Sequence, residues 1–126
     1  GWGCVLAHEG GALAGLVSFG PAKHPVFAGR GEVTHLYVGA AHRQKGLARM
    51  LLLRAFEALG AAGFAQAGLA VLRANAGARA AYARLGGVEL AGFTDAGPLW
   101  PSDNILVVWD DLKGRLAPAG AGSGSD

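Results

Sequence analysis

Basic side chains gather in one short window near the middle of the chain. The cations are Arg43, Lys45, Arg49 and Arg54, with His42 beside them. Gly46 lies among them, where a ligand could approach the backbone without meeting a side chain. A helix that begins here would have unpaired backbone N–H groups and a partial positive charge at its N-terminus. This combination predicts an anion site, most suited to a phosphate or diphosphate.

The order of residues in this window narrows the kind of phosphate site. The P-loop pattern and the dinucleotide-binding glycine fingerprint are both absent. The hexapeptide Arg43-Gln44-Lys45-Gly46-Leu47-Ala48 stands instead, shortly after Leu36-Tyr37-Val38. It resembles the [QR]-x-x-G-x-[GA] signature of the GCN5-related N-acetyltransferase (GNAT) superfamily. A second match is Asn75-x-x-Ala78-x-x-x-Tyr82 followed by Leu85-Gly86-Gly87, and the resemblance spans roughly Cys4 to Leu112.

The resemblance implies an acetyl-CoA-dependent N-acetyltransferase. Such an enzyme moves the acetyl group to a primary amine by direct attack, without a covalent enzyme intermediate. By this resemblance the backbone of Leu36, Tyr37 and Val38 pairs with the pantetheine arm, and Asn75 contacts CoA. The residues expected to cradle or neutralise the diphosphate are Arg43, Gln44, Lys45, Gly46, Leu47, Ala48 and Arg49.

Two side chains are candidates for proton transfer. Tyr82 lies seven residues after Asn75, so both project from one face of a helix. A phenol with a pKa of about 10 can protonate a departing thiolate, whose conjugate acid has a pKa of about 8.5. The resemblance makes Tyr82 the general acid and Glu32 the general base. His35 is an alternative base because imidazole titrates near neutrality, and a water chain is another.

A second interpretation comes from a different class of protein. A complete GNAT domain begins with a further strand and one or two helices that commonly line the acceptor site, and the sequence lacks a match to them. The chain would then be a non-catalytic acyl-CoA-binding module, a fragment, or one subunit whose exposed face a partner covers, as in a homodimer. The acceptor is a small-molecule or peptide amine whose identity the sequence leaves open.

The chain must fold so that these residues meet. Turn residues and apolar periodicity predict one α/β (α+β) domain over residues 1–116 and a flexible tail over 117–126. The order is β-β-β-α-β-α-β-β, a GNAT-like mixed and mostly antiparallel sheet with helices packed on it. The predicted strands are 4–8, 13–19, 32–38, 64–72, 88–94 and 104–110, and the predicted helices are 46–59 and 76–85.

The third predicted strand has an irregular pattern. Val33, Leu36 and Val38 are its apolar positions, and their phase shifts by one residue after Val33. A β-bulge near Thr34 and His35 would turn both halves toward one core face. A bulge also leaves backbone groups free to bind a ligand.

The first predicted helix has one apolar stripe, and its end is marked by glycine. Gly60 and Gly63 are expected to end it. The stripe, at helical spacing, comprises Leu47, Leu51, Ala55, Ala58 and Ala62, with Leu52 and Leu59 at its edge. Asn75 is a good N-cap for the second helix, and Gly86-Gly87 a stop.

Composition excludes several classes of protein. The 126 residues are 52% hydrophobic and 16% charged, which argues against disorder. A net charge of +2, with few aromatic residues among the cations, argues against nucleic-acid binding. One cysteine allows no internal disulfide, and the histidines lack the spacing of a metal site. Without a signal peptide or an apolar run of roughly 20 residues, we expect a cytoplasmic protein with no membrane contact.

Overall fold

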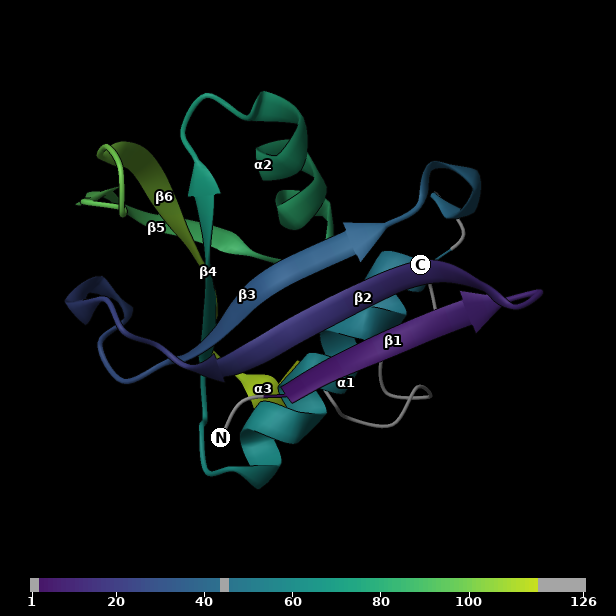
Figure 1. The fold of residues 1–126 in the computed structure, drawn as a ribbon. Helices are drawn as coiled ribbons and strands as arrows, with labels where there is room; N and C mark the ends of the chain where they lie inside the picture. Colours follow the sequence, from purple (N-terminus) through teal and green to yellow (C-terminus); the bar gives the residue numbers. More distant parts are fainter. Residues whose placement is uncertain (1–2, 44–45, 116–126) are drawn as a thin grey trace.

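The computed structural model describes residues 3–43 and 46–115; residues 1–2, 44–45 and 116–126 lie outside this description, the predicted tail among them. Within the described residues, six strands form one sheet in the order β1-β2-β3-β4-β6-β5 (Figure 1). All neighbouring strands are antiparallel except β3 and β4. The elements are β1 (Gly3–Glu9), β2 (Ala12–Pro21), η1 (Pro25–Phe27), β3 (Gly31–Val38), η2 (Ala40–His42), α1 (Leu47–Ala61), β4 (Ala67–Leu72), α2 (Ala76–Arg84), β5 (Val88–Asp95), β6 (Ser102–Trp109) and α3 (Leu112–Arg115).

The predicted fold class and element order are confirmed, with a short third helix added after β6. The tight β1–β2 hairpin has Gly10 and Gly11 at its tip, with φ of 60° and 84°. Positive φ at two consecutive turn residues matches the right-handed twist of the flanking strands, and glycine adopts it without strain. The strand that differs most from its predicted bounds is β4, which begins only at Ala67; the ends of the other strands differ by two residues or fewer.

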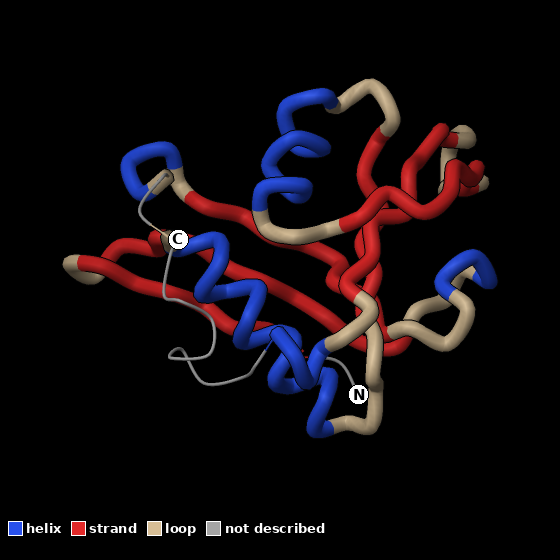
Figure 2. Tube along the Cα trace, turned by 180° about the vertical axis from the view of Figure 1, so that it is seen from behind, coloured by secondary structure: helices blue, strands red, loops and turns tan. Residues whose placement is uncertain are grey.

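Helix α1 covers one face of the sheet and supplies much of the core (Figure 2). Its buried residues are Leu51, Leu52, Ala55, Phe56 and Leu59. The predicted stripe was therefore wrong at its end, since Ala62 is exposed and Phe56 packs inside. Gly60 lies within the helix rather than ending it, and Gly63, with φ of 104°, follows the C-cap.

A second, smaller cluster packs on the opposite face of the sheet. Phe27 of η1 is 2% exposed and packs with Leu106 and Val108 of β6. The ring of Phe27 also stands edge-on to Phe93, with centroids 6.4 Å apart. The proline-marked loop after β2 therefore folds back and covers part of this face, while the same face of β1–β3 is open in Figure 1. We call the uncovered surface of β1–β3 the open face.

The predicted bulge in β3 is confirmed. Ser18 of β2 pairs with His35 and Phe19 pairs with Val33, so Thr34 is an extra residue on β3. Val33 is buried in the main core, and Leu36 and Val38 pack against it. The inserted residue thus keeps both halves of the strand on the α1 face, as the phase shift required.

Strands β3 and β4 separate soon after they meet. Their parallel pairing comprises only Gly31 with Ala67 and Glu32 with Gly68. Beyond Glu32 the strands diverge, and Figure 1 shows α2 on the β4 side of the opening. The β4-facing edge of β3 therefore has backbone groups that no described strand pairs with.

Helix α2 begins where the sequence predicts. The Asn75 side-chain oxygen accepts a hydrogen bond from the Ala78 N–H at 3.1 Å, which satisfies one of the orphan donors of the first turn. A bidentate ion pair connects α2 to β5. Arg79 Nε and a terminal nitrogen of Arg79 each donate a hydrogen bond to the Glu89 carboxylate at 2.8 Å. This hydrogen-bonded pairing lowers the pKa of Glu89.

We expect Asn75→Ala to lower the free energy of unfolding by about 1 kcal/mol, because the first turn of α2 loses its side-chain cap. Urea unfolding followed by circular dichroism measures this change. Asn75→Asp, which keeps the accepting oxygen, serves as the control and should remain near the wild type. Equal stability of the wild type and the alanine variant would contradict the capping role.

None of the described helices is both long and apolar enough to cross a membrane.

Candidate functional site

A cavity of about 700 Å³ opens between the end of β3, the turn before α1, and α2. Its volume lies within the range of about 300–1,000 Å³ that is typical of small-molecule and cofactor sites. The residues lining it are Leu36, Tyr37, Val38, Arg43, Gly46, Ala48, Asn75, Gly77, Ala78, Ala81, Tyr82, Arg84 and Leu85. The separation of β3 from β4 thus creates a cavity against which α2 packs.

Most residues predicted to bind the cofactor line this one cavity. They come from three separate parts of the sequence: Leu36, Tyr37, Val38, Arg43, Gly46, Ala48 and Asn75. Gln44 and Lys45 lie outside the described residues. Leu47 contacts the core instead, and Arg49 lines a separate cavity of about 340 Å³ with Arg54 and Glu57.

Gly46 is the N-cap of α1 and has φ of 79°, a conformation that strains any side chain. A Cβ at this position would meet no atom of the described residues beyond its chain neighbours within 4 Å. The backbone conformation, rather than lack of space, therefore explains why position 46 is a glycine. No side chain of the described residues caps the helix, so the N–H groups of Leu47 and Ala48 at its start are candidates to bind an anion.

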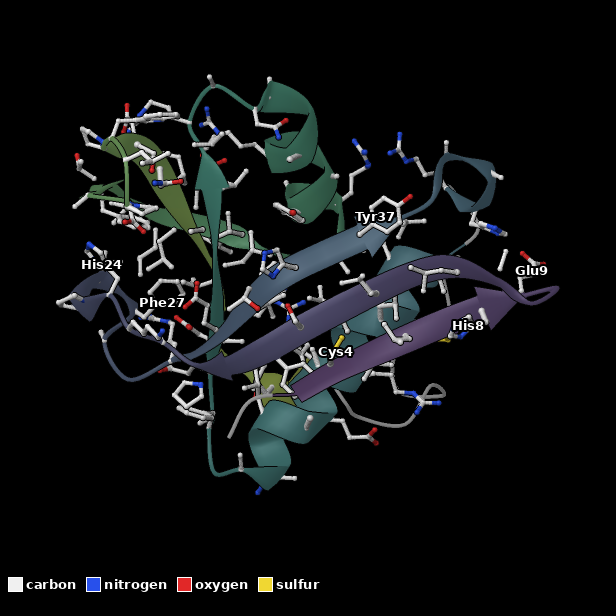
Figure 3. The ribbon with its side chains drawn as sticks, viewed as in Figure 1. Cys4, His8, Glu9, His24, Phe27 and Tyr37 are labelled. Carbon is white, nitrogen blue, oxygen red and sulfur yellow. The ribbon has the colours of Figure 1, made fainter. Side chains whose placement is uncertain are left out.

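Arg43 supplies positive charge at the mouth of the cavity. Its Nε donates to the Val38 carbonyl oxygen at 3.2 Å, which ties the turn back to the end of β3. Figure 3 shows Tyr37 near the same end of the strand. The cation and the open edge of β3 therefore lie next to each other.

Tyr82 lines the cavity from α2 and is half-buried. Its ring stands edge-on to Trp109, with centroids 6.5 Å apart, which fixes the direction of the side chain. Burial raises the pKa of the Tyr82 phenol, because the charged form would lose solvation. The phenol therefore stays protonated at neutral pH, as a proton donor must.

Glu32 lies elsewhere on β3. It pairs with Gly20 and Gly68 at the start of the strand and is absent from the residues that line the cavity. Burial raises the pKa of its carboxyl group, and the charge of Asp95 raises it further, while nearby His35, Lys23 and His24 act in the opposite direction. The structure therefore gives Glu32 the raised proton affinity of a base without bringing it to the cavity wall.

The chain matches the model of the acetyltransferase (GNAT) family over residues 1–87, well over half of its length. It belongs to the GNAT family. Among curated proteins, none matches it in sequence.

Solved structures share the GNAT fold described above. A GNAT-family acetyltransferase from Desulfovibrio desulfuricans has a TM-score of 0.70 and 23% identity, over 89% of this chain and 70% of that one. The protein yncA from Salmonella typhimurium, solved with its cofactor acetyl-CoA, has a TM-score of 0.67 and 26% identity, over 93% and 68%. Ribosomal-protein-alanine N-acetyltransferase from Brucella melitensis has a TM-score of 0.67 and 21% identity, over 86% and 68%.

The matched motif contains Ala78 and Leu85, but only Asn75 and Tyr82 were predicted to act in the site. Gly77, Ala78, Ala81, Arg84 and Leu85 also line the cavity of this GNAT domain. Ala78, Ala81 and Leu85 share a helical face with Asn75 and Tyr82, so the helical period could have found them. Gly77 and Arg84 lie off that face, and the period gives no signal for them. Small residues there leave room for a ligand, and Arg84 adds a second cation.

The segment between β3 and α1 contacts the β1–β2 hairpin through a side-chain pair. His42 is the last residue of η2, directly before Arg43, and its Nδ1 lies 2.6 Å from a carboxylate oxygen of Glu9. Figure 3 shows Glu9 at the end of β1, next to the hairpin turn. This pair connects two segments that are distant in sequence and bears on the orientation of the turn.

We expect Glu9→Gln to weaken acetyl-CoA binding about two- to fivefold, because loss of the carboxylate charge weakens the contact with His42 that holds the turn. Isothermal titration calorimetry measures the dissociation constant. Glu57→Gln, which removes an exposed acid from the outer side of α1, is the matched control and should leave affinity unchanged. A loss of the same size in both variants would show a general charge effect instead.

Proposed function

We propose that this chain is an acetyl-CoA-dependent N-acetyltransferase that acetylates a primary amine of a small molecule or peptide. The observation that supports this most is the cavity of about 700 Å³ described above. It joins the unpaired edge of β3, the uncapped start of α1 and the Tyr82 side chain. These parts suit the three portions of acetyl-CoA: an amide-containing arm, a diphosphate and a thioester.

In this proposal the protein holds its co-substrate with backbone groups and cations. The edge of β3 from Leu36 to Val38 pairs with the pantetheine amides as another strand would. First-turn N–H groups of α1 receive the diphosphate, and Arg43 adds a charge-assisted contact. A backbone N–H of β3 polarises the thioester carbonyl.

Tyr82 and Glu32 divide the proton transfers. Acetyl-CoA supplies an activated thioester, and the attacking amine must be neutral. Glu32 receives the proton that the acceptor ammonium loses, through water or an intervening group, and its raised pKa suits this role. Tyr82 gives its phenolic proton to the sulfur as the C–S bond breaks. The proton that leaves nitrogen as the amide forms restores the phenol.

The position of Glu32 favours a second candidate, a non-catalytic acyl-CoA-binding module. Glu32 lies outside the cavity lining, and the open face carries no described element that would enclose an acceptor. Both candidates bind acetyl-CoA through the same residues, so binding alone does not separate them.

Two measurements on the full chain separate these candidates. Calorimetry with acetyl-CoA tests the site, with Arg43→Ala as a variant expected to bind more weakly. Release of free CoA thiol over a panel of polyamines, aminoglycosides, amino acids and peptides tests turnover. Binding with amine-dependent thiol release supports the enzyme, and binding without release supports the module. Absence of binding by a folded chain would overturn both candidates.

A further inference from the structure

A hydrogen-bonded group of three side chains lies on the open face beside the bulge. Ser18 Oγ is 2.6 Å from Thr34 Oγ1 and 3.0 Å from His35 Nδ1. In a regular strand, consecutive residues such as Thr34 and His35 would point to opposite faces. The bulge places both opposite Ser18, so both can reach one hydroxyl.

This group lies on the side of the sheet away from α1. Val17 and Phe19, the neighbours of Ser18 along β2, are buried in the core on the α1 face. Alternation therefore directs Ser18 to the open face. His35 is exposed there, and it directly precedes Leu36, the first β3 residue that lines the cavity.

His35 is thus closer to the cavity along β3 than Glu32 is. Leu36 is four residues beyond Glu32, and a strand rises about 3.3 Å per residue, so roughly 10 Å or more separates their backbones. His35 precedes Leu36 by one residue, and it is close enough to Glu32 to act on its carboxyl group electrostatically. The imidazole therefore lies between the proposed base and the proposed thioester position along the strand.

Ser18 and Thr34 determine which ring nitrogen can act. If His35 Nδ1–H donates to Ser18 Oγ, the Ser18 hydroxyl can donate to Thr34, and Nε2 presents its lone pair to the open face. The same Nδ1–H bond persists when Nε2 gains a proton, so the hydroxyl pair stabilises the imidazolium without rearranging.

We propose that His35 is the catalytic group that takes the proton from the acceptor ammonium, with Ser18 and Thr34 as positioning residues. This inference rests on the proposed acetyltransferase function and makes His35 the intervening group between the amine and Glu32. It also assigns the direction of entry, because the acceptor must approach from the open face.

The proton balance is complete without another reactant. An N–H bond of the ammonium breaks, its proton forms a bond to His35 Nε2, and the electron pair stays on nitrogen. The neutral nitrogen then attacks the thioester carbon. His35 returns its proton to the solvent or to Glu32, and the second nitrogen proton restores Tyr82 as described above.

Other charged groups lie near this face and contribute to its potential. Asp95 of β5, with Lys23 and His24 from the segment before and at the start of η1, act electrostatically on Glu32 together with His35. His24 has its own partners, since Nε2 lies 3.3 Å from the Thr94 carbonyl oxygen and Nδ1 accepts from the Val26 N–H. His35 is therefore the histidine of this group that a Ser–Thr pair orients.

The test compares His35→Gln, His35→Ala and Ser18→Ala with the wild type, using the best amine of the panel. We expect His35→Gln to lower kcat/KM for the amine about 100-fold, within the range of general-base catalysis. The fall of kcat/KM at acidic pH, which is the acidic limb of the profile, should disappear in His35→Gln. The dissociation constant of acetyl-CoA should stay unchanged. Added imidazole should restore part of the His35→Ala rate. Ser18→Ala should lose less activity and shift the acidic limb.

His8→Gln is the matched control, because His8 is an exposed histidine on β1, outside the hydrogen-bonded group. It should keep the wild-type rate and pH profile. If His35→Gln keeps both of these, the inference is wrong while the proposed function stands. If the wild type releases no thiol with any amine, the proposed function fails and the inference with it.

Discussion

Tyr82→Phe is expected to lower kcat about 100- to 10,000-fold while leaving the dissociation constant of acetyl-CoA unchanged. The substitution removes only the hydroxyl, so the departing thiolate loses its proton donor. The ring remains, and with it the edge-on contact to Trp109 at 6.5 Å between centroids. The cavity wall and the packing of α2 should therefore stay intact.

The pH dependence gives an independent check on Tyr82. Burial raises the pKa of the phenol in the folded chain, so the folded state holds this proton to higher pH than the unfolded state does. The resulting contribution to stability is present below the ordinary phenol pKa of about 10 and is lost as pH rises above it. Tyr82→Phe should lose less stability than the wild type in that alkaline range.

Stopped-flow thiol release and calorimetry measure the rate and the affinity, and alkaline urea unfolding measures the stability difference. Tyr37→Phe is the matched control, because Tyr37 also lines the cavity but is 48% exposed at the end of β3. A Tyr82→Phe enzyme within a few-fold of wild-type kcat would mean that water protonates the sulfur.

Local patterns in the sequence predicted much of this fold. The order of elements and the cap at Asn75 each depend on residues close together in the chain. The bulge at Thr34 and His35 also left a local trace, a phase shift in the apolar pattern. Each of these features is a property of a short segment, so the residues of that segment are enough to predict it.

Features that depend on distant segments were harder to predict. Phe27 packs against β6 because the loop after β2 folds back over the sheet. The apolar periodicity of a short segment does not show where such a loop will pack. Phe56 is buried against the sheet while Ala62, the C-cap of α1, is exposed, and this difference depends on how the helix lies on the sheet. For the same reason the sequence could place Glu32 on β3 but not its position relative to the cavity.

Trp109→Ala is expected to lower the free energy of unfolding by about 3–5 kcal/mol, the usual cost of deleting a buried aromatic ring. Trp109 is fully buried at the end of β6. Its ring lies 5.5 Å from that of Phe56 on α1 and 6.5 Å from that of Tyr82 on α2, centroid to centroid. One side chain therefore joins the sheet to both helices. Because domains are stable by only about 5–15 kcal/mol, this variant should be close to unfolding.

Trp109→Phe separates the ring from its hydrogen bond. The indole Nε1 donates to the Leu85 carbonyl oxygen at the C-cap of α2, at 3.1 Å, and phenylalanine removes that donor. We expect a smaller loss of about 1–3 kcal/mol, since a partly buried carbonyl is left without its partner. Leu85 and Tyr82 line the same cavity, so this variant should also lower kcat by altering the position of the phenol.

Urea unfolding of both variants checks these values, and the matched control is Trp100→Ala. Trp100 is 71% exposed in the β5–β6 loop, so its removal should change stability by no more than about 0.5 kcal/mol. A Trp109→Phe variant with wild-type stability and a wild-type rate would contradict the link between this indole and the position of Tyr82 on α2. If stability falls while kcat is unchanged, Trp109 supports the fold alone, and the direction of Tyr82 is set by α2 itself.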